Sequence, residues 1–139
     1  MTAKTFAEVS VGQRAEFETS IDEALVDAFV ALSGDTNPLH TDEAYAAGTA
    51  FGRRLPHGMI GGALFSRFVG VHLPGRYSLY LSQSLLFKKP LPLDTAIIVS
   101  GEIVQKIESA RAIRMTTTIT DKSSGATLID GEAMVQLLQ

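Results

Sequence analysis

One apolar segment, residues 58–71, constrains the fold of this chain more than any other feature. Its length favours a helix over a strand, although Gly61 and Gly62 each cost about 1 kcal/mol relative to alanine inside a helix. Bulky apolar residues recur at positions 60, 64 and 68, beside small residues at positions 58, 62, 66 and 70. Because a helix that is apolar on most sides is buried, we expect a buried helix whose small-residue side allows a sheet or a ligand to approach closely.

The second half of the chain is predicted to form long antiparallel strands. Alternating apolar and polar residues over 113–120 are typical of a half-buried strand, and residues 121–125 have the composition of a turn. The other predicted strands cover residues 77–89, 95–107 and 129–137, and residues 16–19 belong to or adjoin one more. Together these elements predict an α+β domain in which an antiparallel sheet of about five strands wraps around the apolar helix.

The first half is predicted to contain two shorter helices. Ser20 and Glu23 have the spacing of a capping box, which predicts an amphipathic helix over residues 21–33 that ends at Gly34. Thr41 is expected to cap a second helix, which runs through residue 47 and stops at Gly48.

The composition excludes several classes of protein. The absence of cysteine rules out a disulfide framework, a thiolate zinc site and a cysteine nucleophile. The balance of 12 basic against 15 acidic residues argues against a nucleic-acid partner. No apolar run approaches the roughly 20 residues of a membrane helix, and the first six residues lack a signal-peptide core. We therefore expect a single cytoplasmic domain over residues 1–139, without membrane attachment.

Two of the three histidines lie in loops rich in glycine and proline, where reactive groups are often displayed. Gly34 ends the preceding helix and Asn37-Pro38 forces a turn, so the side chains of Asp35 and His40 can converge. A carboxylate and an imidazole at one point can hold and deprotonate a water, because both accept hydrogen bonds. The alternative is that Asp35 serves only as a helix-end or turn residue.

The second loop, residues 51–59, delivers the chain to the start of the apolar helix. Free N–H groups there, including that of Gly58, suit negative charge such as an oxyanion on a carbonyl. In the alternative interpretation, His57 only orients the loop and Arg53-Arg54 is a solvated pair. We expect the third histidine, His72, to be structural.

Four side chains in these loops have metal-ligating chemistry: Asp35, His40, Asp42 and His57. No helical His-x-x-x-His or similar spacing supports a metal site. We therefore predict no metal.

The two loops also form one ordered motif. It runs Gly34-Asp35-x-Asn37-Pro38-Leu39-His40-x-Asp42, then Ala47, Phe51-Gly52 and His57-Gly58-Met59, and is followed by segments 63–66 and 80–88. This combination resembles the MaoC-like hydratase family over nearly the whole chain, and is most similar to the short (R)-specific enoyl-CoA hydratases of the PhaJ type. The resemblance implies the hot-dog fold, a long helix wrapped by an antiparallel sheet.

The resemblance also implies an activity, the reversible syn hydration of trans-2-enoyl-CoA to (R)-3-hydroxyacyl-CoA. Asp35 and His40 match the catalytic dyad of the family. Gly58 matches the residue whose N–H binds the oxyanion. The residues expected at the oxyanion and substrate-binding part of the site are Gly58, Asn37, His57 and Ser66. No cofactor is expected, because the thioester itself supplies the electron sink.

Further expectations concern substrate contacts and assembly. The acyl pocket is expected to be lined partly by Gly62, with Phe68 and Val69 limiting its depth to short or medium chains. The candidates for contacting CoA phosphates are Arg53, Arg54, Lys88 and Lys89. One sheet layer over one helix leaves edges and apolar faces that a partner would cover, so we expect a homodimer.

Three other functions remain open at this stage. A 3-hydroxyacyl-[acyl-carrier-protein] dehydratase would use the same dyad on a carrier-protein thioester. A hot-dog thioesterase would share the fold, but it does not explain the two histidine-containing loops. A non-catalytic acyl-CoA-binding subunit is the alternative from a different class, and the intact Asp35–His40 pair argues against it.

Overall fold

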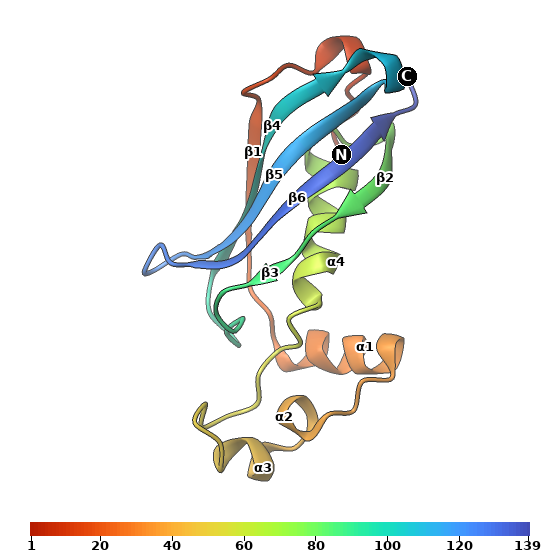
Figure 1. Cartoon of the computed structure of the whole chain (residues 1–139). Helices are drawn as coiled ribbons and strands as arrows, with labels where there is room; N and C mark the ends of the chain where they lie inside the picture. Colours follow the sequence, from red (N-terminus) through yellow and green to blue (C-terminus); the bar gives the residue numbers. More distant parts are fainter.

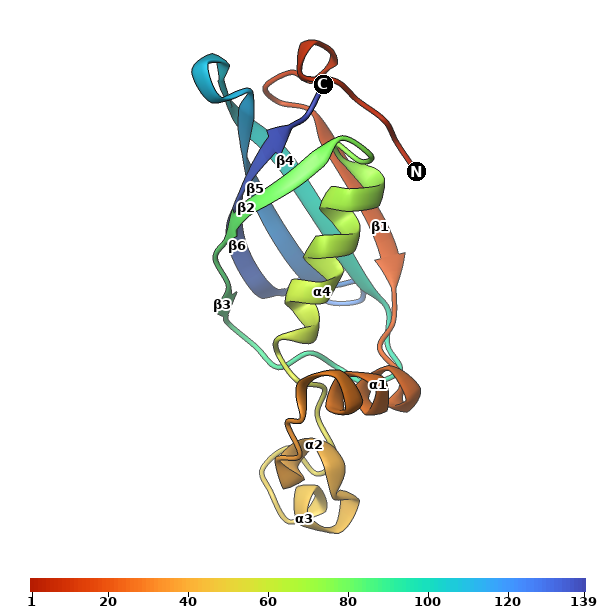
Figure 2. The same cartoon turned by 90° about the vertical axis from the view of Figure 1, so that its right-hand side faces the viewer.

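The computed structural model describes all 139 residues, in which a strongly twisted antiparallel sheet curves around one helix (Figures 1 and 2). The helical elements are η1 (Phe6–Glu8), α1 (Glu23–Ser33), α2 (Pro38–Thr41), α3 (Glu43–Ala47), α4 (Ile60–Arg67), the π-helix η2 (Phe68–His72) and η3 (Glu108–Ala110). The strands are β1 (Arg14–Thr19), β2 (Ser78–Gln83), β3 (Leu86–Phe87), β4 (Ile97–Ile107), β5 (Ala112–Asp121) and β6 (Thr127–Leu137). None of the helices combines the length and the apolar character that crossing a membrane requires.

The sheet has the order β1-β4-β5-β6-β2, and the short β3 also pairs with β6. All of these pairings are antiparallel, as expected. The strand predicted over residues 77–89 is divided into β2 and β3, so the sheet has six strands. The break falls at residues 84–85, where the chain passes close to Gly131 of β6: an added Cβ there would lie 2.0 Å from the Ser84 carbonyl oxygen.

The apolar helix packs its bulky side against the sheet. Ile60, Phe65 and Phe68 are at most 1% exposed. Gly61 provides the close approach to the sheet, since an added Cβ would lie 2.3 Å from Cδ1 of Ile129. In the small-residue stripe Ser66 is exposed, whereas Gly58 approaches Phe87 of β3, whose ring would be 2.9 Å from an added Cβ. Gly61, which makes the closer approach to the sheet, lies outside the predicted stripe.

This helix is also less regular than expected. The α-helical part has eight residues, and the chain continues as five residues of π-helix before it turns at Leu73. The buried Phe68 opens that π-helical turn and lies against Gly101 of β4, where an added Cβ would be 2.6 Å from its ring.

The three helices α1 to α3 extend beyond one end of the sheet (Figures 1 and 2). Helix α1 begins two residues later than predicted, because Asp22 rather than Ser20 is the N-cap and accepts a hydrogen bond from Leu25 N at 2.8 Å. The predicted capping box is therefore wrong, while Gly34 ends the helix in the left-handed conformation with φ 73°.

The second predicted helix is two separate helices. Asp42 ends α2 and caps α3 by accepting a hydrogen bond from Tyr45 N. Thr41 instead donates to the carbonyl groups of Thr36 and Asn37. The prediction that Thr41 caps this helix is therefore wrong, since its hydroxyl group is used inside the preceding turn.

Candidate active site

The loop between α1 and α2 displays Asp35 in a fixed conformation. Asp35 Oδ1 accepts a hydrogen bond from Asn37 N at 3.1 Å. Asn37 Oδ1 accepts one from Leu39 N at 3.0 Å and caps α2, with Pro38 in the first turn. Such side-chain-to-backbone turns hold short loops in place. The carboxylate of Asp35 is half exposed, and its Oδ2 receives no backbone hydrogen bond.

His40 in α2 is held through one ring nitrogen. Its Nδ1 lies 2.7 Å from the carbonyl oxygen of Leu55. Because a carbonyl oxygen only accepts, Nδ1 must carry the proton in this contact. A neutral His40 therefore keeps Nε2 as an acceptor, and that nitrogen has no partner within the protein.

His57 is the buried member of the group and is only 2% exposed. Its ring stacks on His40, with centroids 3.9 Å apart, and contacts Phe29 at 4.8 Å. His57 Nε2 lies 3.1 Å from the backbone carbonyl oxygen of Asp35 and 3.8 Å from its Oδ2. Because the Asp35 carbonyl oxygen only accepts, Nε2 carries the proton in this contact, and Nδ1 is buried without a partner.

Asp35, His40 and His57 bring one polar side-chain atom each to within 4.8 Å of one another. Two acceptors that share a water at ordinary hydrogen-bond lengths stand roughly 4.5–5 Å apart, so this spacing suits a bound water. The arrangement is less suitable for a shared metal ion. Imidazole lone pairs lie in the ring plane, and the stacked rings of His40 and His57 are inclined by only 29°, so their lone pairs do not converge on one point. Asp42, the fourth residue with metal-ligating chemistry, is the cap of α3.

Gly58, the next residue along the chain, offers a free donor. Its N–H makes no hydrogen bond within the protein, and it precedes Met59, the N-cap of α4. Such orphan N–H groups favour negative charge. Gly58 also borders a pocket of about 390 Å³ lined by Pro56, Gly58, Met59, Phe87, Lys88, Lys89, Pro90, Leu91 and Ile129.

The residues predicted for the acyl pocket have different environments. Gly62 is partly exposed and faces Leu85, whose Cδ1 would be 3.5 Å from an added Cβ. Phe68 and Val69 are 0% and 1% exposed and belong to the central apolar core. Ser66 is exposed on the outer side of α4.

The four basic candidates for phosphate contacts also differ. Lys89 has no ion-pair partner and lines the pocket beside Gly58. Lys88, in the same pocket, pairs with Asp130 at 2.6 Å. Arg53 is half exposed, 3.4 Å from Asp94. The side chain of Arg54 is only 14% exposed and is held by other parts of the protein.

Two groups that hold His40 were not predicted from the sequence. The Leu55 carbonyl oxygen binds its ring, and the Arg54 side chain binds its backbone carbonyl oxygen. A backbone carbonyl group leaves no residue-type signal, and an Arg-Arg pair is typical of a solvated surface. His72 is structural as expected: it stacks on Phe17 at 4.5 Å, and burial lowers its pKa.

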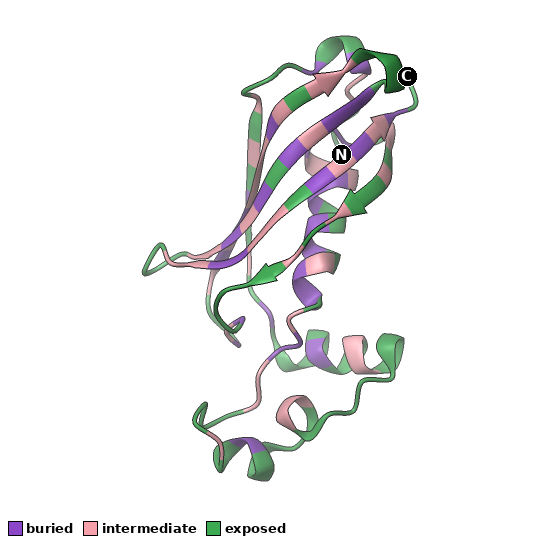
Figure 3. Ribbon diagram, viewed as in Figure 1, coloured by how far each residue is buried: buried purple, intermediate pink, exposed green.

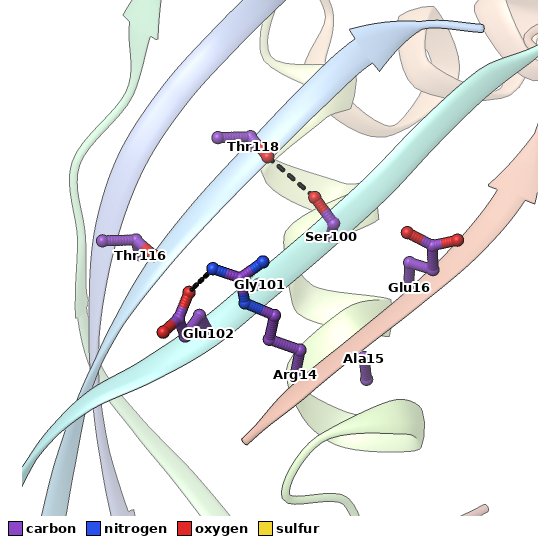
Figure 4. Close-up of a pocket in the computed structure, with 8 residues that line it drawn as sticks. All are labelled: Arg14, Ala15, Glu16, Ser100, Gly101, Glu102, Thr116 and Thr118. Carbon is purple, nitrogen blue, oxygen red and sulfur yellow. Dashed lines mark hydrogen bonds and ion pairs between the residues drawn. The ribbon is translucent and has the colours of Figure 1, made fainter. Parts of the chain in front are cut away.

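A second hollow, of about 450 Å³, lies on the outer face of the sheet across β1, β4 and β5 (Figure 4). It contains an Arg14–Glu102 ion pair and a Ser100–Thr118 hydrogen bond. None of the predicted site residues lines it. The chemistry suggested by the sequence is therefore at the end of α4 and not on this face.

Comparison with known proteins agrees with this fold. Residues 5–124 match the family described as MaoC like domain. The chain therefore belongs to the MaoC-like family, and its sheet wrapped around a helix is the hot-dog fold.

Several relatives of known sequence or structure are similar to this chain over most of its length. The chain is 43% identical to the (R)-specific enoyl-CoA hydratase of Aeromonas caviae, over 93% of this chain and 96% of the relative. It is 33% identical to the (R)-specific enoyl-CoA hydratase of Rhodospirillum rubrum, over 95% and 90%. The unliganded R-hydratase PhaJ1 of Pseudomonas aeruginosa superposes with a TM-score of 0.91 at 41% identity, covering 96% of this chain and 84% of that structure.

Proposed function

We propose that this protein is a hydro-lyase that reversibly adds water to trans-2-enoyl-CoA and forms (R)-3-hydroxyacyl-CoA. The observation that carries the proposal is the convergence of Asp35 and His40, which bring one polar side-chain atom each to within 4.8 Å of one another, together with the unpartnered Nε2 of His40. The Gly58 N–H, one residue beyond the stacked His57, supplies the donor that a thioester oxygen needs. The hydratases named among the relatives support the substrate class and the (R) configuration.

The geometry gives each group a role. Asp35 Oδ2 and His40 Nε2 accept the two hydrogens of one water and orient its oxygen toward C3 of the substrate. As the C3–O bond forms, His40 takes a proton and the double-bond electrons move to the thioester oxygen, where the Gly58 N–H stabilises the charge. C2 then takes a proton from the dyad. Both additions occur on the side where the water is held, so the hydration is syn.

One assay tests the proposal. Hydration of crotonyl-CoA and of longer enoyl-CoAs is followed by the loss of the conjugated thioester absorbance. We expect turnover of short and medium chains, if Phe68 and Val69 limit the depth of the acyl pocket as predicted from the sequence. Turnover of carrier-protein thioesters alone would instead identify a dehydratase of fatty-acid synthesis. No turnover of either would leave the non-catalytic acyl-CoA-binding alternative.

The proposed reaction needs no metal or organic cofactor, because the thioester accepts the electrons and the three-residue cluster is used to hold water. We expect kcat to be unchanged after dialysis against EDTA. A loss that added divalent cations restore would show that Asp35, His40 and His57 bind a metal instead.

We further propose that two copies associate over the exposed side of α4 and the neighbouring sheet edge. Strand β2 is an edge strand, and its Leu79 and Leu81 are 47% and 52% exposed. Leu86 and Phe87 of β3 extend this apolar surface with 60% and 50% exposure. Long apolar edges are normally covered. Sedimentation should give a dimer at micromolar concentration, and a stable, active monomer would contradict this proposal.

A further inference from the structure

The side chain of Arg54 is a largely buried cation whose hydrogen bonds all lie within the protein. Its Nε donates to the backbone carbonyl oxygen of His40 at 2.7 Å, and its Nη2 donates to Asp27 Oδ1 of α1 at 3.0 Å. Its neighbour Arg53 has a side chain that is 51% exposed, against 14% for Arg54. The two consecutive arginines therefore have different environments, and of the two only Arg54 donates a hydrogen bond to the backbone of His40.

Helix α2, which carries His40, cannot position this residue by itself. It has only four residues, and isolated helices of this length are unstable in water. Its last carbonyl groups have no partners within the helix. The side chain of Arg54 satisfies one of them, and a cation is favourable at this end of a helix.

Residues 54 and 55 together hold residues 39 and 40 by three hydrogen bonds, two of which involve His40. Besides the Arg54 contact, Leu55 N donates to the Leu39 carbonyl oxygen at 3.2 Å. The Leu55 carbonyl oxygen then accepts from His40 Nδ1 at 2.7 Å. Because the last contact determines which nitrogen carries the proton, the position of residues 54–55 determines whether Nε2 is free to accept a proton.

We propose that Arg54 is a positioning residue for the dyad. By joining α1 to the carbonyl group of His40, it holds the Leu55 carbonyl oxygen at His40 Nδ1 and so keeps Nε2 as the acceptor that faces the substrate. This role replaces a phosphate contact, since the guanidinium group is largely buried and its Nε and Nη2 already donate to His40 and Asp27. The expected effect of Arg54 on kcat rests on the proposed hydratase activity, whereas its expected effect on the tautomer of His40 does not.

The kinetic test compares Arg54→Met with Arg54→Lys on crotonyl-CoA. Arg54→Met should lower kcat by roughly 10- to 100-fold, the scale of a misplaced catalytic group, with KM within about threefold of the original. Lysine should restore part of the loss, because it can donate to the His40 carbonyl oxygen but cannot bridge to Asp27 as well. The control is Lys122→Met, which removes a cation from an exposed pair with Glu18 and should leave kcat unchanged.

A second measurement separates positioning from mere stability. Nitrogen-15 chemical shifts of the histidine rings, of which there are three, report the tautomer of His40. The unmodified protein should show the Nδ1–H form of His40, and Arg54→Met should show a mixture of the Nδ1–H and Nε2–H forms.

A lower melting temperature of Arg54→Met with an unchanged His40 tautomer and unchanged kcat would overturn the proposal. A higher, less salt-dependent KM at unchanged kcat would also overturn it, in favour of a phosphate contact. A wild-type protein without hydratase activity would refute the proposed function, and the tautomer comparison would still decide the role of Arg54.

Discussion

The sheet with α4 and the segment that carries the dyad are stabilised in different ways. Of the 24 residues in the apolar core, only Val26 comes from residues 22–57. Figure 3 shows buried positions throughout the sheet and α4, whereas α1 to α3 are mostly exposed. The sheet is held by apolar burial, which is large and not directional. The dyad segment is held by caps, turns and side-chain contacts, so a substitution there should alter the geometry of the site more than the stability of the fold.

The largest expected effect comes from the dyad itself. Asp35→Asn preserves shape but removes the carboxylate charge, and His40→Gln cannot exchange a proton at neutral pH. Each change should lower kcat by roughly two to four orders of magnitude, the scale of general acid–base catalysis. Both side chains lie outside the apolar core, so the melting temperature should change little. Steady-state kinetics on crotonyl-CoA, with thermal melts as the control, check this expectation.

The double variant sharpens the interpretation. If both residues act on one water in one step, the double variant should be scarcely slower than either single variant. Multiplicative losses would show that the two residues act separately, and a folded Asp35→Asn protein with nearly normal kcat would exclude the mechanism.

For Gly61, on the sheet-facing side of α4, we expect a loss of stability rather than a direct effect on catalysis. A methyl group there would clash with Ile129, so Gly61→Ala should lower the free energy of unfolding by about 1–3 kcal/mol. Gly62→Ala meets only an ordinary contact with Leu85 and should instead stabilise the helix by up to about 1 kcal/mol. Denaturant unfolding of both variants measures the difference. Equal stabilities would mean that the core rearranges around the added methyl group.

The sheet was predictable from the sequence because its cause is periodic. Alternation in β5 and β6 and the apolar run of α4 follow directly from burial on one face. The errors arose where a local choice between similar residues decided the outcome. Asp22 and Ser20 are both good N-caps, as are Asp42 and Thr41, and the aspartate is the cap each time.

The site was predictable only in part. Asp35, His40 and Gly58 stand in a specific motif, and the structure brings Asp35 and His40 together. The groups that hold them, the Leu55 carbonyl oxygen and the Arg54 side chain, could not be predicted, because they depend on how two loops pack. The same holds for Tyr80, whose hydroxyl group donates to Gln83 beside the buried Thr117.

The partly buried Tyr80 gives a smaller prediction, on the pH dependence of stability. Burial raises the pKa of Tyr80 to about 12, from 10.0 for an exposed tyrosine. The unfolded chain therefore loses this proton at lower pH than the folded protein does. The stabilising contribution is complete below about pH 10 and is lost as the pH rises toward about 12. Tyr80→Phe should flatten the stability decline in this window. An identical alkaline decline in both proteins, measured by urea unfolding, would show that Tyr80 makes no such contribution.

The smallest effect is expected for the exposed cations near the Gly58 pocket. Lys89 lines this pocket without an ion-pair partner, so it is the basic residue best placed for a CoA phosphate. Lys89→Met should raise KM for crotonyl-CoA by about two- to fivefold, the scale of one exposed ionic contact. It should also make KM less dependent on salt, because screening acts on the contact that is lost. Since this charge contacts bound substrate and not the reacting atoms, its loss should weaken binding alone, and kcat should stay within about twofold of the original.

Lys122→Met serves as the matched control for Lys89→Met and should leave KM unchanged. A fall in kcat without a change in KM would instead place Lys89 among the groups that hold the dyad.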